Sequence, residues 1–207
     1  MSERIGLYGG SFDPIHFGHL ISARSIAEQI DLSRVILIPS ARPPHKQGVW
    51  MTEAEHRLAM CRLAVHGDPL FEVSGVELNR EGPSYTFDTV AHFRAQSSDT
   101  AGLFWIIGAD SLPELPTWYR IADLVANVHI VTATRPGWES PSLSVLSQAV
   151  GPDHAQALLD NCHETPAIDI SATDIRDRFV AGRSIHYLTP DAVASYISGH
   201  GLYPSPG

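Results

Sequence analysis

Short apolar runs, each followed by a segment of helical periodicity, recur along this chain and limit the folds open to it. The most convincing runs are "RIGLYGG" (residues 4–10), "RVILIPS" (34–40), "GLFWIIGAD" (102–110) and "NVHIVTATRPG" (127–137). They are too short for core helices and predict buried strands. Parallel neighbours need crossover connections, so alternating strands and helices favour a parallel sheet. We therefore predict an α/β fold, a doubly wound Rossmann-like parallel sheet with helices on both faces.

The remaining segments extend this pattern and add a helical C-terminal part. The periodicity predicts helices at about residues 20–30, 86–96, 173–180 and 190–200, and a further strand or hairpin piece at 71–78. Thr52 and Glu55 have the spacing of a capping box for a helix that runs through about Val65. From Ser142 the pattern is helical, interrupted by the strand-like "PAIDI" at 166–170. No internal repeat or long linker divides residues 1–207, so we expect a single domain.

Composition narrows the class of function. Fourteen Lys plus Arg against 23 Asp plus Glu give a formal charge of −9, which argues against nucleic acid as a partner. A small anionic ligand, held by local cations and backbone amides, remains open. Cys61 and Cys162 lie far apart without a C-x-x-C pattern, so neither a disulfide framework nor a thiolate metal site is expected. No signal peptide or membrane-spanning apolar run is recognisable, and we expect a cytoplasmic protein that does not contact membranes.

The stretch "GGSFDPIHFGHL" (residues 9–20) follows the first predicted strand, where ligands bind in doubly wound sheets. It matches neither G-x-G-x-x-G nor the P-loop pattern. His16 and His19 would share one helix face, with Gly18 between them. Such a pair can be ordinary surface or two ligands of a metal ion, but no third ligand accompanies it, whereas the flanking glycines suit a phosphate. A histidine donor on an α-phosphate would stabilise charge that grows during displacement.

A second stretch, "ISATDIR" (residues 170–176), leads into a predicted helix. Ser171 and Thr173 are natural helix caps, and on their own they would favour that structural interpretation. Arg176 favours the alternative, because a helix N-terminus, hydroxyls and a guanidinium within one turn make an anion site. This site would suit the outer phosphates of a nucleotide.

Together the two stretches resemble the H-x-G-H and I-S-S-T-x-x-R signatures of the adenylyltransferase and cytidylyltransferase superfamily, with Ala172 in place of the second serine. The segments between them resemble the bacterial nicotinate mononucleotide adenylyltransferase family. The segments that carry this resemblance are "PSARPPHK" (39–46), "GPSYTFDTV" (82–90), "IGADSLPELPTWYR" (107–120) and "TRPG" (134–137). The resemblance covers residues 5–203, and the joint occurrence of these segments in order is specific.

The resemblance implies transfer of AMP from ATP to nicotinate mononucleotide, with His16, His19 and Arg176 as catalytic residues. It implies Mg²⁺ bound mainly through the ATP phosphates, with no metal site built from protein ligands alone, and it leaves the oligomeric state open. The implied ATP-binding residues are Gly9, Gly10, Ser11, Phe12, His16, His19, Lys46, Gly108, Asp110, Ile170, Ser171, Thr173 and Arg176. The implied residues for the mononucleotide are Ser84, Tyr85, Thr86, Leu115, Trp118, Tyr119 and Arg135.

Several of these residues also have plain structural interpretations. Lys46 can be an exposed loop lysine, and Asp110 can cap a helix as well as bind the adenosine ribose. Trp118 can be ordinary core instead of a stacking partner for the pyridine ring, and Arg135 can form a surface salt bridge. Asp13 is expected to fix its turn through an Asx-type hydrogen bond.

Alternative functions differ in acceptor or in chemistry. The same transfer could use nicotinamide mononucleotide, phosphopantetheine, or a phosphorylated alcohol with CTP, and the two central segments argue against the last two. A non-catalytic nucleotide-binding sensor could also keep this fold. The presence of His16, His19 and Arg176 argues against a sensor.

Overall fold

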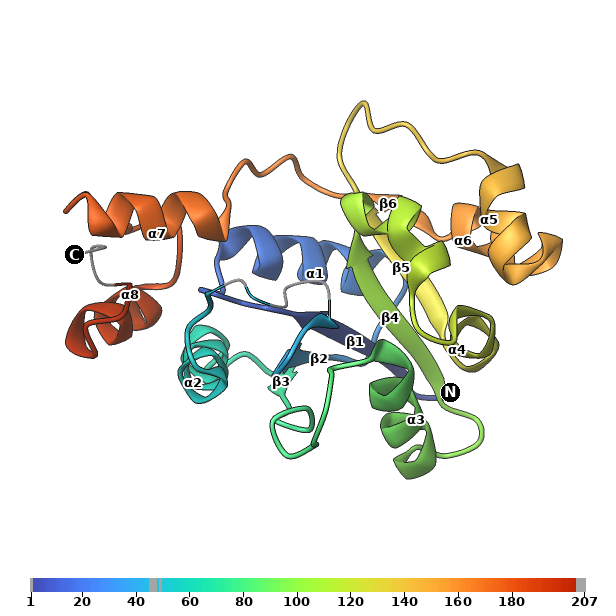
Figure 1. The fold of residues 1–207 in the computed structure, drawn as a ribbon, viewed down its shortest axis with the longest axis horizontal. Coiled ribbons are helices and arrows are strands. Elements are labelled where there is room, and N and C mark those ends of the chain that lie inside the picture. Colours follow the sequence, from blue (N-terminus) through green and yellow to red (C-terminus); the bar gives the residue numbers. More distant parts are fainter. Residues whose placement is uncertain (1, 45–47, 49, 204–207) are drawn as a thin grey trace.

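One parallel sheet forms the centre of the molecule. The computed structural model describes residues 2–44, 48 and 50–203, and within them six strands pair in the order β3-β2-β1-β4-β5-β6 (Figure 1). The strands are β1 (Arg4–Gly10), β2 (Arg34–Pro39), β3 (Phe71–Val73), β4 (Gly102–Gly108), β5 (His129–Thr134) and β6 (Cys162–Glu164). All neighbouring strands are parallel, and the order reverses between β1 and β4. This is the strand order of a doubly wound dinucleotide-binding fold, as predicted.

Helices cover both faces of the sheet. They are α1 (Phe17–Gln29), α2 (Ala54–Ala64), α3 (Thr86–Gln96), α4 (Ile121–Asn127), α5 (Leu143–Val150), α6 (Pro152–Asp160), α7 (Ala172–Val180) and α8 (Asp191–Gly199), with the 3₁₀ helix η2 (Ala109–Thr117). One hydrophobic core joins the sheet to α1, α2, α7 and α8. A second core on the opposite face joins it to α3, η2, α4, α5 and α6. Successive residues of one strand, such as Val35 and Ile36 of β2, therefore face different cores, which is why the strands read as continuous apolar runs.

Two local predictions were wrong, and a third was correct only in part. The strand-like "PAIDI" has no regular structure, and the last strand is instead β6, only three residues long. Of "FEVSGVEL" only the first three residues form a strand, β3. The Thr52–Glu55 capping box does not form, because α2 begins after Glu53 and has no side-chain cap. The backbone of Thr52 is engaged elsewhere: its N–H donates to Asp13 and its carbonyl accepts from Arg57.

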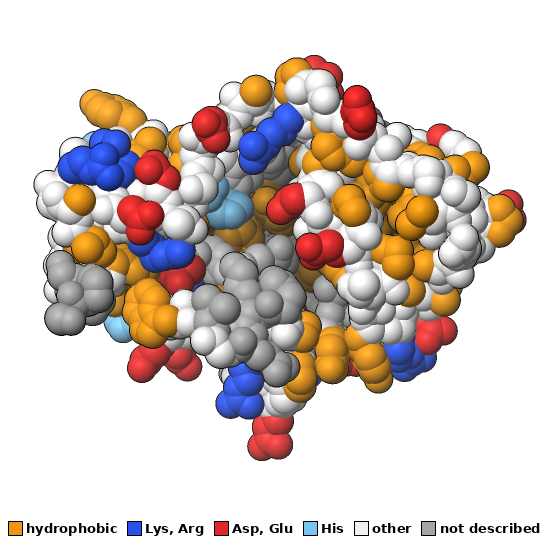
Figure 2. Space-filling view, turned by 45° about the horizontal axis from the view of Figure 1, so that its top comes forward, with side chains coloured by type: hydrophobic (Ala, Val, Ile, Leu, Met, Phe, Trp, Pro, Cys, Tyr) orange, Lys and Arg blue, Asp and Glu red, His pale blue; other side chains and the backbone are white. Residues whose placement is uncertain are grey.

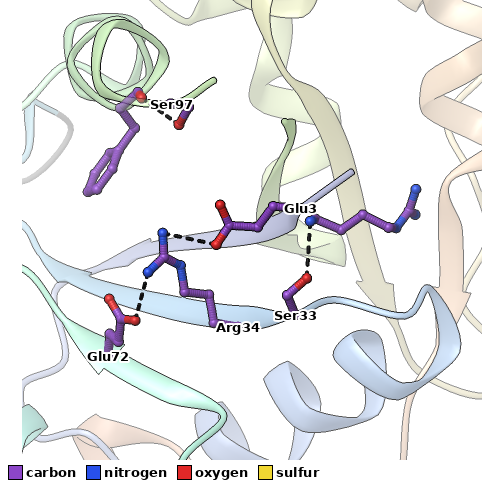
Figure 3. A network of polar contacts seen from close by, with 7 residues as sticks. Glu3, Ser33, Arg34, Glu72 and Ser97 are labelled. Carbon is purple, nitrogen blue, oxygen red and sulfur yellow. Dashed lines mark hydrogen bonds and ion pairs between the residues drawn. The ribbon is translucent and has the colours of Figure 1, made fainter. Parts of the chain in front are cut away.

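Polar contacts tie the strands together at the end where β1 and β2 begin. The guanidinium of Arg34 bridges Glu3, at 3.2 Å, and Glu72, at 2.9 Å (Figure 3). The N–H of Arg4 donates to the hydroxyl of Ser33 at 3.2 Å. These groups are partly exposed and contribute modestly to stability. These contacts lie at the amino ends of the strands. The candidate site lies at the opposite edge, where the strands have their carboxyl ends.

Within the described ranges, none of the helices is long and apolar enough to cross a membrane.

Candidate active site

A large cleft opens at the carboxyl edge of the sheet, beyond the ends of β1 and β4. It encloses about 1430 Å³ and is lined by residues from both sequence motifs and from the segments between them. Figure 2 shows a hollow in the middle of this face with histidine on its wall and charged side chains around its rim. The N-cap residues of helices α1, α3 and α7 are His16, Tyr85 and Ser171, and all three line the cleft. Because helix N-termini carry partial positive charge, the cleft suits anionic ligands despite the acidic chain.

His16 and His19 form a close pair on the cleft wall. Their ring centroids lie 3.7 Å apart, with planes inclined by 31°. The backbone N–H of His16 donates to Nδ1 of His19 at 3.3 Å, so the neutral His19 ring carries its proton on Nε2. Burial lowers the pKa of His16 from 6.5 to about 4, which keeps that ring neutral near pH 7. The predicted shared face is therefore present, and both rings line the cleft.

Small and aromatic neighbours fix this pair. A Cβ at Gly18 would lie 3.0 Å from Nδ1 of His16, so a side chain there would displace the ring. The Phe12 ring packs edge-on against His19 with a centroid distance of 5.0 Å. Phe12 itself has a left-handed backbone, with φ of 47°, and is 1% exposed. Phe12 thus supports the His19 ring of the pair.

Gly9 and Gly10 have a packing role that the sequence did not indicate. They are the last residues of β1 and do not form a separate turn. A Cβ at Gly9 would lie 2.5 Å from the Trp105 ring, and one at Gly10 would lie 3.0 Å from Phe12. Close packing of rings against the strand therefore requires these glycines, whether or not a phosphate approaches.

The second motif meets the first one directly. Nη1 of Arg176 donates to the carbonyl of Asp13 at 2.6 Å, and Nη2 donates to the Thr173 hydroxyl at 3.2 Å. The Ser171 hydroxyl accepts the Asp174 N–H at 3.0 Å and caps α7. The capping interpretation of Ser171 is thus correct, and Ser171, Thr173 and Ile170 also line the cleft. The guanidinium of Arg176 is therefore held beside residues 11–16, the part of the first motif between β1 and α1, which we call the first-motif loop.

The predicted mononucleotide residues other than Leu115 line the same cleft. The rings of Tyr85 and Tyr119 stack with a centroid distance of 4.3 Å, and Tyr119 is 48% exposed. Ser84 pairs twice with Arg42, through N–H to carbonyl at 2.9 Å and through its hydroxyl at 3.0 Å. Trp118 packs partly against the core. The cleft lining includes these residues together with Thr86 and Arg135.

The remaining predicted residues are Leu115, Asp110 and Lys46. Leu115 does not reach the cleft: its side chain is 1% exposed in the core, and only its carbonyl acts locally, accepting the Trp118 N–H at 2.9 Å. Asp110 lines the cleft beside Gly108, where a Cβ would lie 2.6 Å from the Asp110 carboxylate. It does not cap η2, whose N-cap is Gly108. Lys46 lies outside the described residues.

Other residues of the cleft were not predicted. They include Tyr8, Glu77, Trp105, Glu114, Trp138 and Thr165. Asp13 was predicted to make a local Asx bond, but its carboxylate instead accepts from Thr52, 39 positions away, and from Tyr203, 190 positions away. No local pattern signals such contacts, since they depend on the C-terminal segment returning to the first loop.

The acidic side chains of the cleft are dispersed. The acidic residues that line it are Asp13, Glu77, Asp110 and Glu114. Across the part of the chain that the structure describes, no group of three His, Cys, Asp or Glu side chains is placed to hold a metal ion. A divalent cation here would therefore take most of its ligands from bound phosphates and water.

The cleft and fold define a class of protein. A family model described as cytidylyltransferase-like matches residues 7–178, so the chain is one of the cytidylyltransferase-like proteins. Two curated relatives, from Moorella thermoacetica and a Roseiflexus species, are each 43% identical and named "Probable nicotinate-nucleotide adenylyltransferase". They align over 97% and 98% of this chain and 91% and 98% of their own lengths. The chain therefore belongs to the nicotinate-nucleotide adenylyltransferase family.

A solved structure has the same fold. The Plasmodium falciparum nicotinic acid mononucleotide adenylyltransferase complexed with NaAD superposes with a TM-score of 0.73 over 97% of both chains. Its sequence identity is 17%. This likeness supports the Rossmann-like architecture independently of sequence similarity.

Proposed function

We propose that the cleft at the carboxyl edge holds both substrates of the reaction. The chain transfers the AMP part of ATP to nicotinate mononucleotide, forming deamido-NAD and pyrophosphate in NAD biosynthesis. In this proposal ATP occupies the end formed by the two motifs, and the mononucleotide occupies the end formed by Tyr85, Trp118 and Tyr119. Residues 1–207 act as one nucleotidyltransferase domain.

The chemistry requires alignment and neutralisation of charge. The acceptor phosphate is an anion at neutral pH, so an oxygen of it can attack the α-phosphorus of ATP while the bond to the β-phosphate breaks. His16 and His19 donate hydrogen bonds to the phosphates, and Arg176 stabilises the departing pyrophosphate. Lys46 reaches the outer phosphates, and Asp110 accepts from the adenosine ribose. No covalent enzyme intermediate is needed.

The mononucleotide end is proposed to bind the ring and its carboxylate. Trp118 stacks on the pyridine ring, while backbone amides near Thr86 and Tyr119 donate to the nicotinate carboxylate. Arg135 contributes positive charge near this substrate. Its side chain lines the cleft, and among the described residues no carboxylate forms a salt bridge with it.

Mg²⁺ is proposed to accompany ATP. When bound with ATP, it would neutralise part of the phosphate charge. The dispersed carboxylates fit a cation held mainly by ATP and water. A cytoplasmic location is proposed as well, in keeping with Cys61 and Cys162, which are both free.

One observation favours this proposal over the alternative functions. The Asp13 carbonyl and the Arg176 guanidinium are 163 positions apart in sequence, yet they are in direct contact, which joins both phosphate-binding motifs in one cleft. A non-catalytic sensor would not need the histidine pair and the guanidinium on the same polyphosphate.

Pyrophosphate release tests the proposal. ATP with Mg²⁺ is offered with nicotinate mononucleotide, nicotinamide mononucleotide or phosphopantetheine, and CTP replaces ATP in a parallel series. We expect release with ATP and nicotinate mononucleotide, strongly reduced by His19→Ala but unchanged by His154→Ala, because His154 is exposed on α6. Nucleotide binding without release for any acceptor would favour the sensor and reject the enzyme.

A further inference from the structure

The first-motif loop is held from the C-terminal part of the chain. The Thr189 hydroxyl donates to the carbonyl of Ile15 at 2.7 Å, and the N–H of Phe17 donates to the carbonyl of Leu188 at 3.1 Å. Both contacts flank His16, the N-cap of α1. The position of the histidine pair therefore depends on a segment more than 170 residues further along the chain.

Asp13 is the polar centre of this arrangement. Its carboxylate is buried, at 5% exposure, and accepts two hydrogen bonds: one from the Tyr203 hydroxyl at 2.8 Å and one from the Thr52 N–H at 3.0 Å. Burial, and then the neighbouring Asp13 carboxylate, raise the pKa of Tyr203, so its hydroxyl remains a donor. Each carboxylate oxygen thus has a fixed donor on a different part of the chain.

A buried arginine balances the charge of this carboxylate. Arg57, on α2, is 1% exposed, and its guanidinium donates to the carbonyls of Thr52, at 2.8 Å, and Ser11, at 2.7 Å. The Asp13 charge is among those that favour its charged form. A buried charge is tolerated only when paired and hydrogen-bonded, so Asp13 and Arg57 stabilise each other.

The backbone of Asp13 continues the chain of contacts to Arg176. The Asp13 carboxylate accepts from the Tyr203 hydroxyl, and the backbone carbonyl of Asp13 accepts from Nη1 of Arg176 at 2.6 Å. A shift of Asp13 therefore moves one of the two anchors of that guanidinium, the other being the Thr173 hydroxyl.

We propose that Tyr203 is a positioning residue for ATP, acting through Asp13 on the guanidinium of Arg176. The inference rests on the proposed role of Arg176 at the ATP phosphates. Tyr203 does not line the cleft; its ring is 3% exposed in the core, near Trp50 and Phe179. Its hydroxyl supplies one of the two donors that fix Asp13.

Tyr203→Phe isolates this hydroxyl, because it keeps the ring in the core and removes the bond to Asp13 together with the hydroxyl's contact to the Thr52 side chain. A hydrogen bond to a charged, buried acceptor is among the stronger kinds, so its loss lets Asp13 shift. We expect the KM for ATP to rise roughly tenfold, with the KM for nicotinate mononucleotide changed less than about twofold.

Tyr196→Phe is the matched control. Tyr196 lies on α8, and its hydroxyl is bound to Nδ1 of His56 at 2.9 Å, away from the first-motif loop. This variant removes a tyrosine hydroxyl contact of similar length from the same part of the chain. We expect it to leave both KM values unchanged. Thermal unfolding of both variants separates loss of stability from loss of positioning.

A double-mutant cycle that combines Tyr203→Phe with Arg176→Ala tests whether Tyr203 acts through Arg176. If Tyr203 acts through Arg176, Tyr203→Phe has little further effect on ATP affinity once the guanidinium is absent. Equal effects of Tyr203→Phe and Tyr196→Phe, or full additivity of Tyr203→Phe with Arg176→Ala, would overturn the proposal. ATP affinity measured by calorimetry does not depend on turnover. A wild-type protein that binds ATP but transfers nothing would therefore refute the proposed function while leaving this inference testable.

Discussion

The imidazole rings of His16 and His19 face each other with centroids 3.7 Å apart, and the backbone N–H of His16 donates to Nδ1 of His19. Two protonated imidazoles at this separation would repel each other strongly. Burial lowers the pKa of His16 to about 4, so this ring is the neutral member of the pair near pH 7. In the proposed function the pair therefore donates hydrogen bonds to the phosphates while carrying no more than one positive charge.

Removing either ring should impair the chemical step more than folding. His19→Ala and His16→Ala are each expected to lower turnover by about two orders of magnitude or more, since each removes stabilisation of charge in the transition state. Steady-state turnover at saturating ATP, with circular dichroism as a folding control, checks this. Near-normal turnover in either variant would return that histidine to an ordinary surface role.

The buried neutral His16 should make stability depend on pH. Its folded pKa of about 4 lies below the ordinary value of 6.5, so between these values the unfolded chain binds more protons. The contribution is fully present above pH 6.5 and is lost as pH falls toward 4, up to about 3 kcal/mol. The difference in unfolding free energy between wild type and His16→Asn should therefore shrink or change sign across this window. His154→Asn, at an exposed position, serves as the control and should show no such trend.

Gly18 should be required for activity because of its contact with His16. Gly18→Ala places a Cβ 3.0 Å from Nδ1 of His16, and the displaced ring should lower turnover at least about tenfold. Gly199→Ala is the matched control, because Gly199 ends helix α8 and a Cβ there meets nothing within 4 Å. Equal turnover in the two variants would mean that the ring moves aside without consequence.

Most of the sheet was predictable because the residues of β1, β2, β4 and β5 themselves specify buried strands. Runs such as that of β4 are apolar on both faces, which is the pattern of a parallel strand buried between helix layers. β6 was missed because its three residues, Cys162–Glu164, carry no apolar pattern and are held only by pairing with β5. The Thr52–Glu55 cap failed because tertiary contacts to Asp13 and Arg57 fix the backbone of Thr52.

The site was predictable where short motifs supply its residues and not where distant segments meet. His16, His19 and Arg176 were singled out from the spacing of the histidines, the hydroxyls before the arginine and the family resemblance, and the structure brings all three to one cleft. The partners of Asp13 lie up to 190 positions away, so no window of sequence contains them. The sequence predicted that Gly9 lets a phosphate approach the backbone. The structure shows a different reason for glycine here: a Cβ would collide with the ring of Trp105 on the neighbouring strand β4.

Arg176→Ala should mainly raise the ATP requirement. In the proposed function the guanidinium contributes to binding of the outer phosphates and to stabilising pyrophosphate as it leaves. Arg176→Lys should recover only part of the loss, because a single ammonium cannot contact the Asp13 carbonyl, the Thr173 hydroxyl and a phosphate together. ATP affinity measured by calorimetry checks both variants. Unchanged affinity in the alanine variant would remove Arg176 from the ATP site.

The final prediction concerns the choice between the acid and amide mononucleotides. These substrates differ at one group, and backbone N–H donors near Thr86 and Tyr119 would form charge-assisted hydrogen bonds with a carboxylate that an amide cannot fully replace. The stack of Tyr85 on Tyr119, at 4.3 Å, joins the start of α3 to the segment after η2 and fixes these donors relative to each other. We expect nicotinate mononucleotide to be preferred by at least about 10²-fold in kcat/KM, or roughly 3 kcal/mol.

Two variants separate recognition of the ring from recognition of its substituent. Trp118→Ala should weaken both mononucleotides alike, because stacking contacts the ring and not the group attached to it. Tyr85→Ala removes the stack with Tyr119 and should reduce the preference itself, since the donors on the two segments are then held less firmly. The measurement is kcat/KM for both substrates in wild type and in each variant. Comparable wild-type efficiencies for acid and amide would reject the carboxylate site, while adenylyl transfer as the reaction would stand.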